Sequence, residues 1–356
     1  MILTHLELRN FRSYAETSLD FGDRLNLILG PNAAGKSNLA EAIHYLSLAR
    51  SWRTPDDRLL IKDGCESALL QATVQEGGLT RRIEIEIAKG HKRISLNGKP
   101  VHRISELSKL VNVIVFAPSD VGLFVNSPGE RRNFLDVALC KQSLDYFNLI
   151  GRYNRLLAER NAALKRQHVD LKVVDVLTSQ MIEVAEPLVK FRHLYVNELN
   201  RVLPDLIVQL RGPGSEASIV YHPFVKDDSH FAESAQNAFK EALESDLLHR
   251  STSLGPHRED FLFRLNGKNV ADYGSQGENR LAVLALKFAP FFLIEDEGKK
   301  PICVLDDATS ELDAPHQKAL LDFTKGLQQV FITATQLDIE GASIIDVSAN
   351  KAIRRN

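Results

Sequence analysis

The chain has 356 residues, of which 44% are hydrophobic and 25% are charged, and its formal net charge is −2. This length allows two domains or one domain with a large insertion, and the balanced charge excludes a protein that is basic over its whole surface. The three cysteines lie far apart, without the spacing of a disulfide framework or a zinc site, which predicts a cytoplasmic protein. The longest apolar stretch, around 281–294, is interrupted by Lys287 and Pro290 and is too short to span a bilayer, so we expect no membrane partner.

The first third of the chain reads as β-structure. Strands are predicted at 2–9 and 24–29. At 80–88 isoleucine alternates with charged residues, which predicts a half-buried antiparallel strand. The dipeptides Asn97-Gly98 and Asn266-Gly267 each predict a tight hairpin, and we expect both hairpins to lie on one sheet. The continuous apolar run 111–116 predicts a strand that is buried on both faces.

The middle of the chain is helical. From about 130 to 203 apolar residues recur at helical spacing, with a polar break at 167–170. Pro187 should kink the second helical run. A further helix is predicted at 231–250. We interpret these segments as a helical hairpin arm inserted into an α/β domain.

After residue 255 strands and helices alternate again. The predicted elements are a strand at 259–265, a helix at 278–295, and strands at 302–306, 329–333 and 343–347. The chain would therefore comprise the first half of an α/β lobe, a helical arm or lid domain, and the second half of the lobe. The corresponding ranges are 1–120, 121–255 and 256–356.

A glycine-bounded loop separates the strand at 25–29 from a helix at 38–48. Its sequence, GPNAAGKS, matches G-x-x-x-x-G-K-[ST], in which backbone N–H groups at a helix N-terminus cradle phosphates. Lys36 would reach the β- and γ-phosphates, and the Ser37 hydroxyl would hold Mg²⁺. We therefore predict ATP and Mg²⁺ as cofactors. The predicted nucleotide-binding residues of this loop are Gly30, Pro31, Asn32, Ala33, Ala34, Gly35, Lys36, Ser37 and Asn38.

Two acids follow the apolar run 302–305. Asp306 ends this strand, where a P-loop site needs an acid to position its metal, so we predict Ser37 and Asp306 as metal ligands. Asp307 lies where a carboxylate could orient or deprotonate an attacking water, which predicts Lys36 and Asp307 as catalytic residues. The alternative is that one of the two acids only caps a helix.

The segment YGSQGENR at 273–280 begins a strongly apolar helix. Ser275, Gln276 and Gly277 would present a hydroxyl and backbone N–H groups there, which forms a second phosphate-binding surface. Because the sequence has a single P-loop, we expect this surface to close on the ATP of a second copy in a two-fold dimer, with Ser275 as a catalytic residue. A plain helix cap is the alternative.

Several cations are candidates for binding DNA phosphates without reading bases. They are Arg152, Arg155, Lys165 and Arg166 on the arm, and Lys92 and Arg93 on the first hairpin. The alternative is an ordinary solvated surface.

Taken together, these stretches resemble the ATPase heads of the ABC and SMC superfamily, and five segments resemble the RecF family in particular. The segments are RSWRT (50–54), FAPSDVGLFVNSPGERRNFLD (116–136), LGPHREDF (254–261), SQGENR (275–280) and LDDATSELD (305–313). The resemblance covers essentially the whole chain. It places Arg12 near the nucleotide, and it gives Arg131 and Arg132 a packing role that competes with DNA binding.

The resemblance implies an α/β fold, an ABC/SMC-type P-loop ATPase head with an inserted, mostly helical arm. It implies a homodimer that forms on ATP, clamps duplex DNA near single-strand gaps, and dissociates after slow, Mg²⁺-dependent, DNA-stimulated hydrolysis. With RecO and RecR, such a protein helps direct RecA onto gapped DNA in recombinational repair. The alternative is the ATPase subunit of an ABC transporter, which predicts a glutamine coupling loop and a switch histidine.

The sequence departs from the family pattern at a few positions. Glu278 and Asn279 replace a typical glutamine pair. The strand before Thr335 ends without a switch histidine, so Thr335 is our candidate sensor of the γ-phosphate. Asp307 stands where many relatives carry glutamate, which suggests a slow, timer-like ATPase.

Overall fold

The computed structural model describes residues 1–101, 107, 110–226, 229–310 and 312–355. Contacts between these residues divide the chain into two compact units. Unit 1 comprises 1–121, 208–213 and 283–356, and unit 2 comprises 122–207 and 214–282. Glu311, which belongs to the LDDATSELD segment, lies outside the described residues.

Unit 1 contains two sheets. In the first, β3 lies between two parallel neighbours, β14 and β13. The order is β15 (Lys351–Arg354), β14 (Ser343–Ser348), β3 (Leu25–Leu29), β13 (Gln329–Ala334), β12 (Ile302–Asp306) and β8 (Val113–Phe116). The second sheet is antiparallel. Its order is β2 (Tyr14–Asp20), β1 (Ile2–Phe11), β4 (Ser67–Glu76), β5 (Leu79–Ala88), β6 (His91–Leu96) and β7 (Lys99–Pro100).

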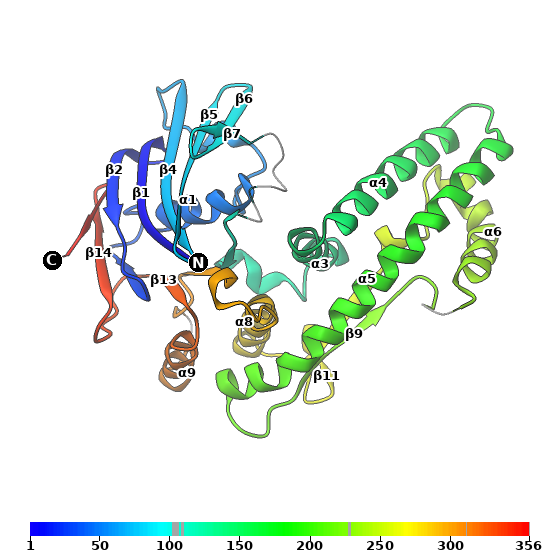
Figure 1. Cartoon of the computed structure of the whole chain (residues 1–356). Coiled ribbons are helices and arrows are strands. Elements are labelled where there is room, and N and C mark those ends of the chain that lie inside the picture. Colours follow the sequence, from blue (N-terminus) through cyan, green and yellow to red (C-terminus); the bar gives the residue numbers. More distant parts are fainter. Residues whose placement is uncertain (102–106, 108–109, 227–228, 311, 356) are drawn as a thin grey trace. The chain divides into compact units, whose positions relative to one another are not determined.

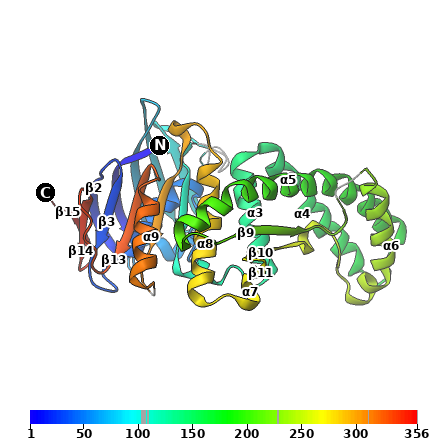
Figure 2. The same cartoon turned by 90° about the horizontal axis from the view of Figure 1, so that it is seen from below.

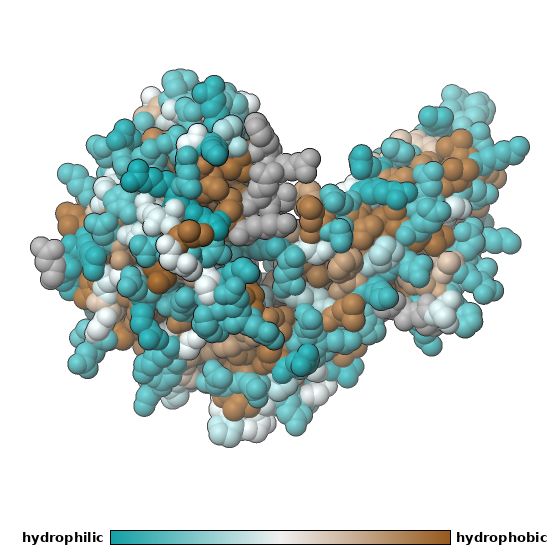
Figure 3. Space-filling model, viewed as in Figure 1, coloured by the Kyte–Doolittle hydropathy of each residue, from teal (hydrophilic) through white to brown (hydrophobic). Residues whose placement is uncertain are grey.

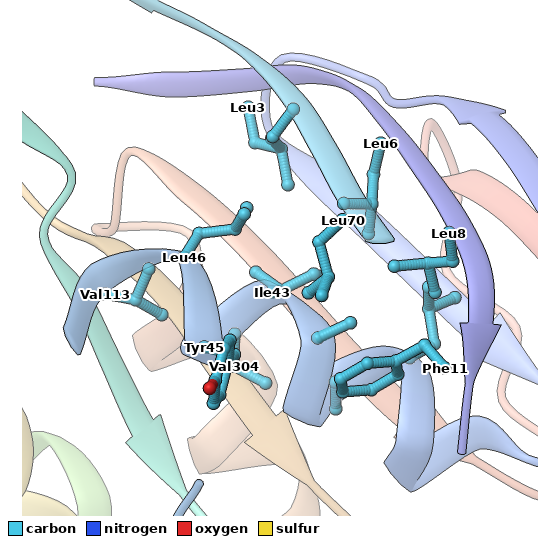
Figure 4. Close-up of a cluster of buried hydrophobic side chains, with 14 of the residues drawn as sticks. Leu3, Leu6, Leu8, Phe11, Ile43, Tyr45, Leu46, Leu70, Val113 and Val304 are labelled. Atoms are coloured by element: carbon cyan, nitrogen blue, oxygen red, sulfur yellow. The ribbon is translucent and has the colours of Figure 1, made fainter. Parts of the chain in front are cut away.

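Helix α1 (Lys36–Leu48) packs in the core that joins these sheets. Figure 4 shows Ile43 of α1 among Leu70 of β4, Val304 of β12 and their neighbours, and all of them are fully buried. Residues 39–47 of α1 are buried at every position, because the helix is covered by apolar strands on more than one side. The described part of unit 1 also contains α9 (Ala314–Thr324) and the short 3₁₀ helices η1 (Asp57–Leu60), η2 (Pro118–Gly122) and η4 (Glu297–Lys299).

Unit 2 combines helices with a small antiparallel sheet. Figures 1 and 2 show α4 and α5 running alongside each other, and apolar residues of both pack against α6 at one end. The helices are α3 (Pro128–Gln142), α4 (Leu144–Leu164), α5 (Leu171–Arg211), α6 (Phe231–His249), the one-turn α7 (Val270–Tyr273) and η3 (Pro256–Arg258). The sheet order is β11 (Lys268–Asn269), β10 (Asp260–Leu265) and β9 (Ala217–His222). Helix α8 (Gln276–Phe292) begins in unit 2 and ends in unit 1, and the last residues of α5, from Val208 on, also belong to unit 1.

Most predicted elements are confirmed, including the parallel strand β12 with its exact bounds at 302–306. The expectation that both hairpins share one sheet is wrong, because β6–β7 extends the antiparallel sheet of unit 1 while β10–β11 pairs with β9 in unit 2. An Asn-Gly turn fixes the local reversal, but it carries no information about the third strand. The pairing of β10 with β9 also keeps 256–282 in unit 2, although we predicted this segment in the second half of the lobe.

The helical region also differs in detail from the prediction. The predicted break at 167–170 is confirmed, because α4 ends at Leu164 and α5 begins at Leu171. Helix α5 continues through Pro187 and Pro204, and the kink at Pro187 stays a prediction. The chain also breaks at Ser143, between α3 and α4, which was not predicted. The Ser143 hydroxyl accepts a hydrogen bond from the N–H of Tyr146 at 3.1 Å and so caps the start of α4.

No helix in the described part of the chain is long and apolar enough to cross a membrane. On the face that Figure 3 shows, apolar side chains reach the surface and polar side chains lie between them. The exposed apolar residues on α4 and α5 are Leu144, Phe147, Leu171, Val173, Val176, Leu194 and Val208.

Candidate functional site: a phosphate-binding loop beside two acids

The predicted phosphate-binding loop follows β3, at the carboxyl edge of the parallel sheet, where ligands bind in open α/β sheets. Gly30, Ala33 and Gly35 have φ values of 156°, 61° and 110°, which turn the backbone sharply before α1 begins at Lys36. The Lys36 ammonium donates to the carbonyl oxygens of Gly30 and Pro31, both at 2.8 Å. Burial lowers the pKa of Lys36, so the loop holds a partly desolvated cation above a helix N-terminus. This arrangement suits the phosphates of a nucleotide.

Gly30 tolerates no side chain at its position. An added Cβ would lie 2.0 Å from the carbonyl oxygen of Val347 in β14, a backbone atom that cannot move away cheaply. We expect Gly30→Ala to lower the free energy of unfolding by about 3 kcal/mol and to displace the loop from its phosphate-binding conformation. Urea unfolding and ATP titration would measure both effects. Gly277→Ala is the matched control, because a Cβ there meets no atom within 4 Å and unfolding should change by less than about 1 kcal/mol. Wild-type stability in Gly30→Ala would contradict the expectation.

Ser37 and Asp306 meet at the mouth of this loop. One carboxylate oxygen of Asp306 accepts hydrogen bonds from the Ser37 hydroxyl at 2.9 Å and from the Thr333 hydroxyl at 2.7 Å. Burial raises the pKa of Asp306, and the charge of Asp307 adds to the shift. A buried carboxylate beside a hydroxyl supplies the hard oxygen ligands that Mg²⁺ takes, and a bound cation would offset the cost of burying the charge. These two residues therefore fit the predicted metal.

Asp307 occupies a strained turn directly after β12. Its φ is 51°, in the left-handed region that non-glycine residues rarely adopt. Its N–H donates to the Thr333 hydroxyl at 2.9 Å, and its side chain is exposed. Thr333 thus fixes both acids at once, by donating to Asp306 and accepting from Asp307. The sequence reasoning missed Thr333, although its position in the strand next to β12 was a usable signal.

Arg12 lies at the first turns of α1, where it binds a buried acid. Its guanidinium donates to both carboxylate oxygens of Glu41, at 2.9 and 2.7 Å. Arg53 donates to Asn38 at 2.7 Å and to Glu41 at 3.2 Å, so three charged groups and an amide form one network beside the loop. Glu41 and Arg53 were missed. Arg53 lies in the RSWRT segment, whereas Glu41 looks like any solvent-facing helix residue in the sequence.

Thr335 follows β13 and is exposed. It lines a shallow pocket together with Gly30 of the phosphate-binding loop and Asp338. The structure therefore brings Thr335 beside the loop, whereas the threonine in contact with Asp306 is Thr333.

The segment at 275–280 starts α8 within unit 2. The Ser275 hydroxyl accepts the N–H of Glu278 at 3.2 Å, and the Glu278 carboxylate accepts the N–H of Ser275 at 2.9 Å, which is a capping box. The helix cap that the sequence offered as the alternative is therefore observed. Ser275 and Gln276 are also exposed, and the space around Gly277 is open, so the helix start is accessible to a ligand.

The candidate DNA contacts fall into two classes. Five are exposed: Arg93, Arg152, Arg155, Lys165 and Arg166. Lys92 is different, because its ammonium donates to the Asp57 carboxylate at 2.6 Å and to the Ala49 carbonyl at 2.5 Å, and lies over the Tyr45 ring. This corrects the prediction for Lys92, whose charge is already paired inside the lobe.

Comparisons with known proteins identify the family of this chain. The family model described as the RecF/RecN/SMC N terminal domain matches residues 2–348. Two curated relatives, each called DNA replication and repair protein RecF, are 36% identical (Lachnoclostridium phytofermentans) and 35% identical (Clostridium tetani) to this chain. Both matches cover 95% of this chain and 94% of the relative.

Two solved structures extend the comparison. A structure of the recombination mediator protein RecF with ATP, described as part of the RecFOR pathway, superposes with a TM-score of 0.90 at 30% identity, covering 100% of this chain and 98% of the other. The Smc head domain of Pyrococcus furiosus, bound to the C-terminal domain of ScpA, shares the fold with a TM-score of 0.60 at 19% identity, covering 99% and 96% of the two chains. With the family model spanning nearly the whole chain and two relatives above 30% identity over almost their full length, this protein belongs to the RecF family of DNA replication and repair proteins.

Proposed function

We propose that this protein is an ATP-gated DNA clamp of recombinational repair. The observation that carries the proposal is the chain of contacts from Ser37 through Asp306 to Thr333, which joins the phosphate-binding loop to the two acids after β12. A relative of the same fold, solved with ATP, supports ATP as the nucleotide.

Each residue of this site has a defined task. Lys36 neutralises the β- and γ-phosphates, and Ser37 and Asp306 hold Mg²⁺, which supplies a Lewis acid when bound. Asp307 orients or deprotonates the attacking water from its exposed position next to Asp306. Arg12 positions α1 through Glu41, 2.7 Å away. Thr335 senses the γ-phosphate from the pocket beside Gly30.

The second phosphate contact comes from a second copy of the chain. The exposed start of α8 offers the Ser275 hydroxyl and the N–H groups of Gln276 and Gly277 to the ATP of the partner. ATP then holds two copies together as a homodimer, and hydrolysis lets them separate.

The partners follow from this cycle. The homodimer closes on double-stranded DNA next to a single-strand gap and holds it through backbone phosphates, with RecR and RecO as protein partners that direct RecA to the gap. The RecFOR pathway that a related structure names supports this assignment. A cytoplasmic location agrees with these partners.

Slow hydrolysis would make the site a timer. The Asp307 carboxylate is short, and its backbone is fixed by Thr333, so it reaches an attacking water poorly. We expect fewer than ~10 turnovers per second, the typical enzyme median, and a higher rate with gapped duplex DNA than without it. A coupled ATPase assay measures both rates, with Lys36→Ala as the inactive control. A fast rate that ignores DNA would contradict the timer.

A further inference from the structure

A cavity of about 240 Å³ lies within unit 2, between the start of α3 and the middle of α4. It has room for several water molecules. The residues of α3 that line it are Gly129, Arg132, Asn133 and Asp136, and those of α4 are Ile150, Tyr153 and Asn154. Two of the segments that carry the family resemblance, SPGERRNFLD and LGPHREDF, contribute residues here, although nothing in the proposed ATPase cycle uses them.

Arg131 and Arg132 have opposite environments. Arg131 is buried and binds both carboxylate oxygens of Asp260, at 2.7 and 2.9 Å, so it is a structural residue. Arg132 is half-buried and lines the cavity. Its only hydrogen bond to another described residue runs to the carbonyl oxygen of Glu259 at 2.7 Å. A guanidinium carries five N–H donors, so Arg132 retains donors for a ligand.

The acids near Arg132 are engaged elsewhere. Asp136 lines the same cavity, but it accepts hydrogen bonds from Arg192 at 2.8 Å and from the Tyr146 hydroxyl. Arg192 is itself fully buried and also binds Glu259 at 2.7 Å. Burial lowers the pKa of Arg132, and the charge of Arg192 adds to this effect, while Asp260 and Asp136 oppose it.

Neutral donors surround this cation. Asn133 and Asn154 are exposed, and neither side-chain amide makes a hydrogen bond to any residue that the structure describes. Gly129 lies in the first turn of α3, where backbone N–H groups point away from the helix and the helix dipole is positive. One cation, two amides and a helix start therefore converge on one cavity, a donor set that suits an oxyanion.

We propose that this cavity binds a phosphate oxygen of the DNA backbone. This inference rests on the proposed function, since it takes DNA as the ligand. Arg152 and Arg155 are exposed on the same helix, but helical spacing places them on other faces of α4 than Asn154, so they do not line the cavity. Free phosphate presents the same oxygens, and the experiment has to separate the two sources.

The test compares four proteins: wild type, Arg132→Gln, Asn154→Asp and Arg201→Gln. Asn154→Asp places a negative charge in the cavity at an exposed position whose side chain makes no hydrogen bond to the described residues, so the fold should be retained. Arg201→Gln is the matched control, because Arg201 is exposed on α5 and does not line the cavity. Fluorescence anisotropy of a labelled gapped duplex with ATP gives the affinity and its salt dependence.

We expect Arg132→Gln and Asn154→Asp to weaken DNA binding on the order of tenfold and Arg132→Gln to reduce the salt slope by about one, with the control unchanged. The basal ATPase rate without DNA should stay at the wild-type value in all four. Unchanged DNA affinity in Asn154→Asp would overturn the proposal, even if free phosphate binds the cavity.

A second measurement keeps failure of this inference distinct from failure of the proposed function. Inorganic phosphate is compared with chloride at equal ionic strength, and the thermal midpoint of each variant is recorded. Any contribution from the phosphate-binding loop is common to all four proteins. If wild type binds no DNA, the proposed function fails. A phosphate shift lost only in Arg132→Gln and Asn154→Asp would still support an oxyanion site, and equal shifts would overturn it.

Discussion

Replacing Asp306 with asparagine is expected to abolish ATP hydrolysis and yet to stabilise the nucleotide-free protein by about 1 kcal/mol. The amide oxygen can still accept hydrogen bonds from Ser37 and Thr333, so the geometry of the site survives. What disappears is a buried negative charge whose pKa is raised by burial. The loss of the metal ligand should slow hydrolysis by about 10³-fold, since metal stabilisation is worth several kcal/mol.

The raised pKa of Asp306 determines at which pH the substitution stabilises the protein. A raised carboxyl pKa means that the folded protein binds this proton more tightly than the unfolded chain, in which aspartate titrates near about 3.9. The wild type therefore loses stability as pH rises through the raised pKa of Asp306. The advantage of Asp306→Asn should be complete above that pKa and should vanish as pH falls toward about 4. Urea unfolding at a series of pH values measures it.

Asp307→Asn is the matched control for this effect. It makes the same chemical change at the next residue, but on an exposed side chain. It should impair hydrolysis without stabilising the protein. An Asp306→Asn variant that is less stable than wild type above the raised pKa, or that hydrolyses ATP at the normal rate, would show that Asp306 does not carry a buried charge for the metal.

Replacing Ser275 with arginine is expected to abolish the ATP-dependent homodimer while each chain still binds one ATP. The long side chain would fill the exposed start of α8, where the proposed phosphate contact of the partner forms. Sedimentation with ATP should then show only monomers, at protein concentrations at which the wild type is dimeric. Ser275→Ala removes the hydroxyl, and with it both the cap and one proposed phosphate contact, at a cost of about 1 kcal/mol of helix stability. It leaves the N–H groups of Gln276 and Gly277 accessible, so it should weaken the dimer less than Ser275→Arg.

A mixing experiment separates a shared site from a local defect. A Ser275→Arg chain keeps its own phosphate-binding loop, and a Lys36→Ala chain keeps its own Ser275. Neither should hydrolyse ATP alone, but a mixed dimer contains one complete site. Activity that returns on mixing supports the two-fold arrangement, and a mixture that stays inactive would argue that Ser275 acts only within its own chain.

The parts of the site that consist of consecutive residues could be predicted from the sequence. The loop 30–37 and the strand that ends at Asp306 are local patterns whose chemistry requires those residue types in that order. The family match also rules against the alternative interpretation, the ATPase subunit of a transporter. The contacts that lock the site were not predictable in the same way, because Thr333 and Glu41 act through side-chain partners that only the folded sheet and helix bring together.

Charge in the sequence was a weak guide to charge at the surface. Lys92 looked like an exposed hairpin cation, but its long side chain reaches the carboxylate of Asp57 and the end of α1. Arg131 and Arg132 are neighbours in sequence, yet Arg131 forms an ion pair with Asp260 whereas Arg132 lines a cavity. Helical spacing places successive residues about 100° apart, so adjacent cations face different surroundings. Which one faces solvent depends on the neighbouring elements.

The most direct test of the ATP-gated clamp is the anisotropy of a labelled duplex titrated with wild-type protein. The titration is run with ATP, with ADP and without nucleotide, each at two salt concentrations. The proposal predicts binding that requires ATP and weakens steeply with salt, because ATP assembles the dimer that contacts the backbone phosphates. Equal binding under all three nucleotide conditions would contradict an ATP-gated clamp.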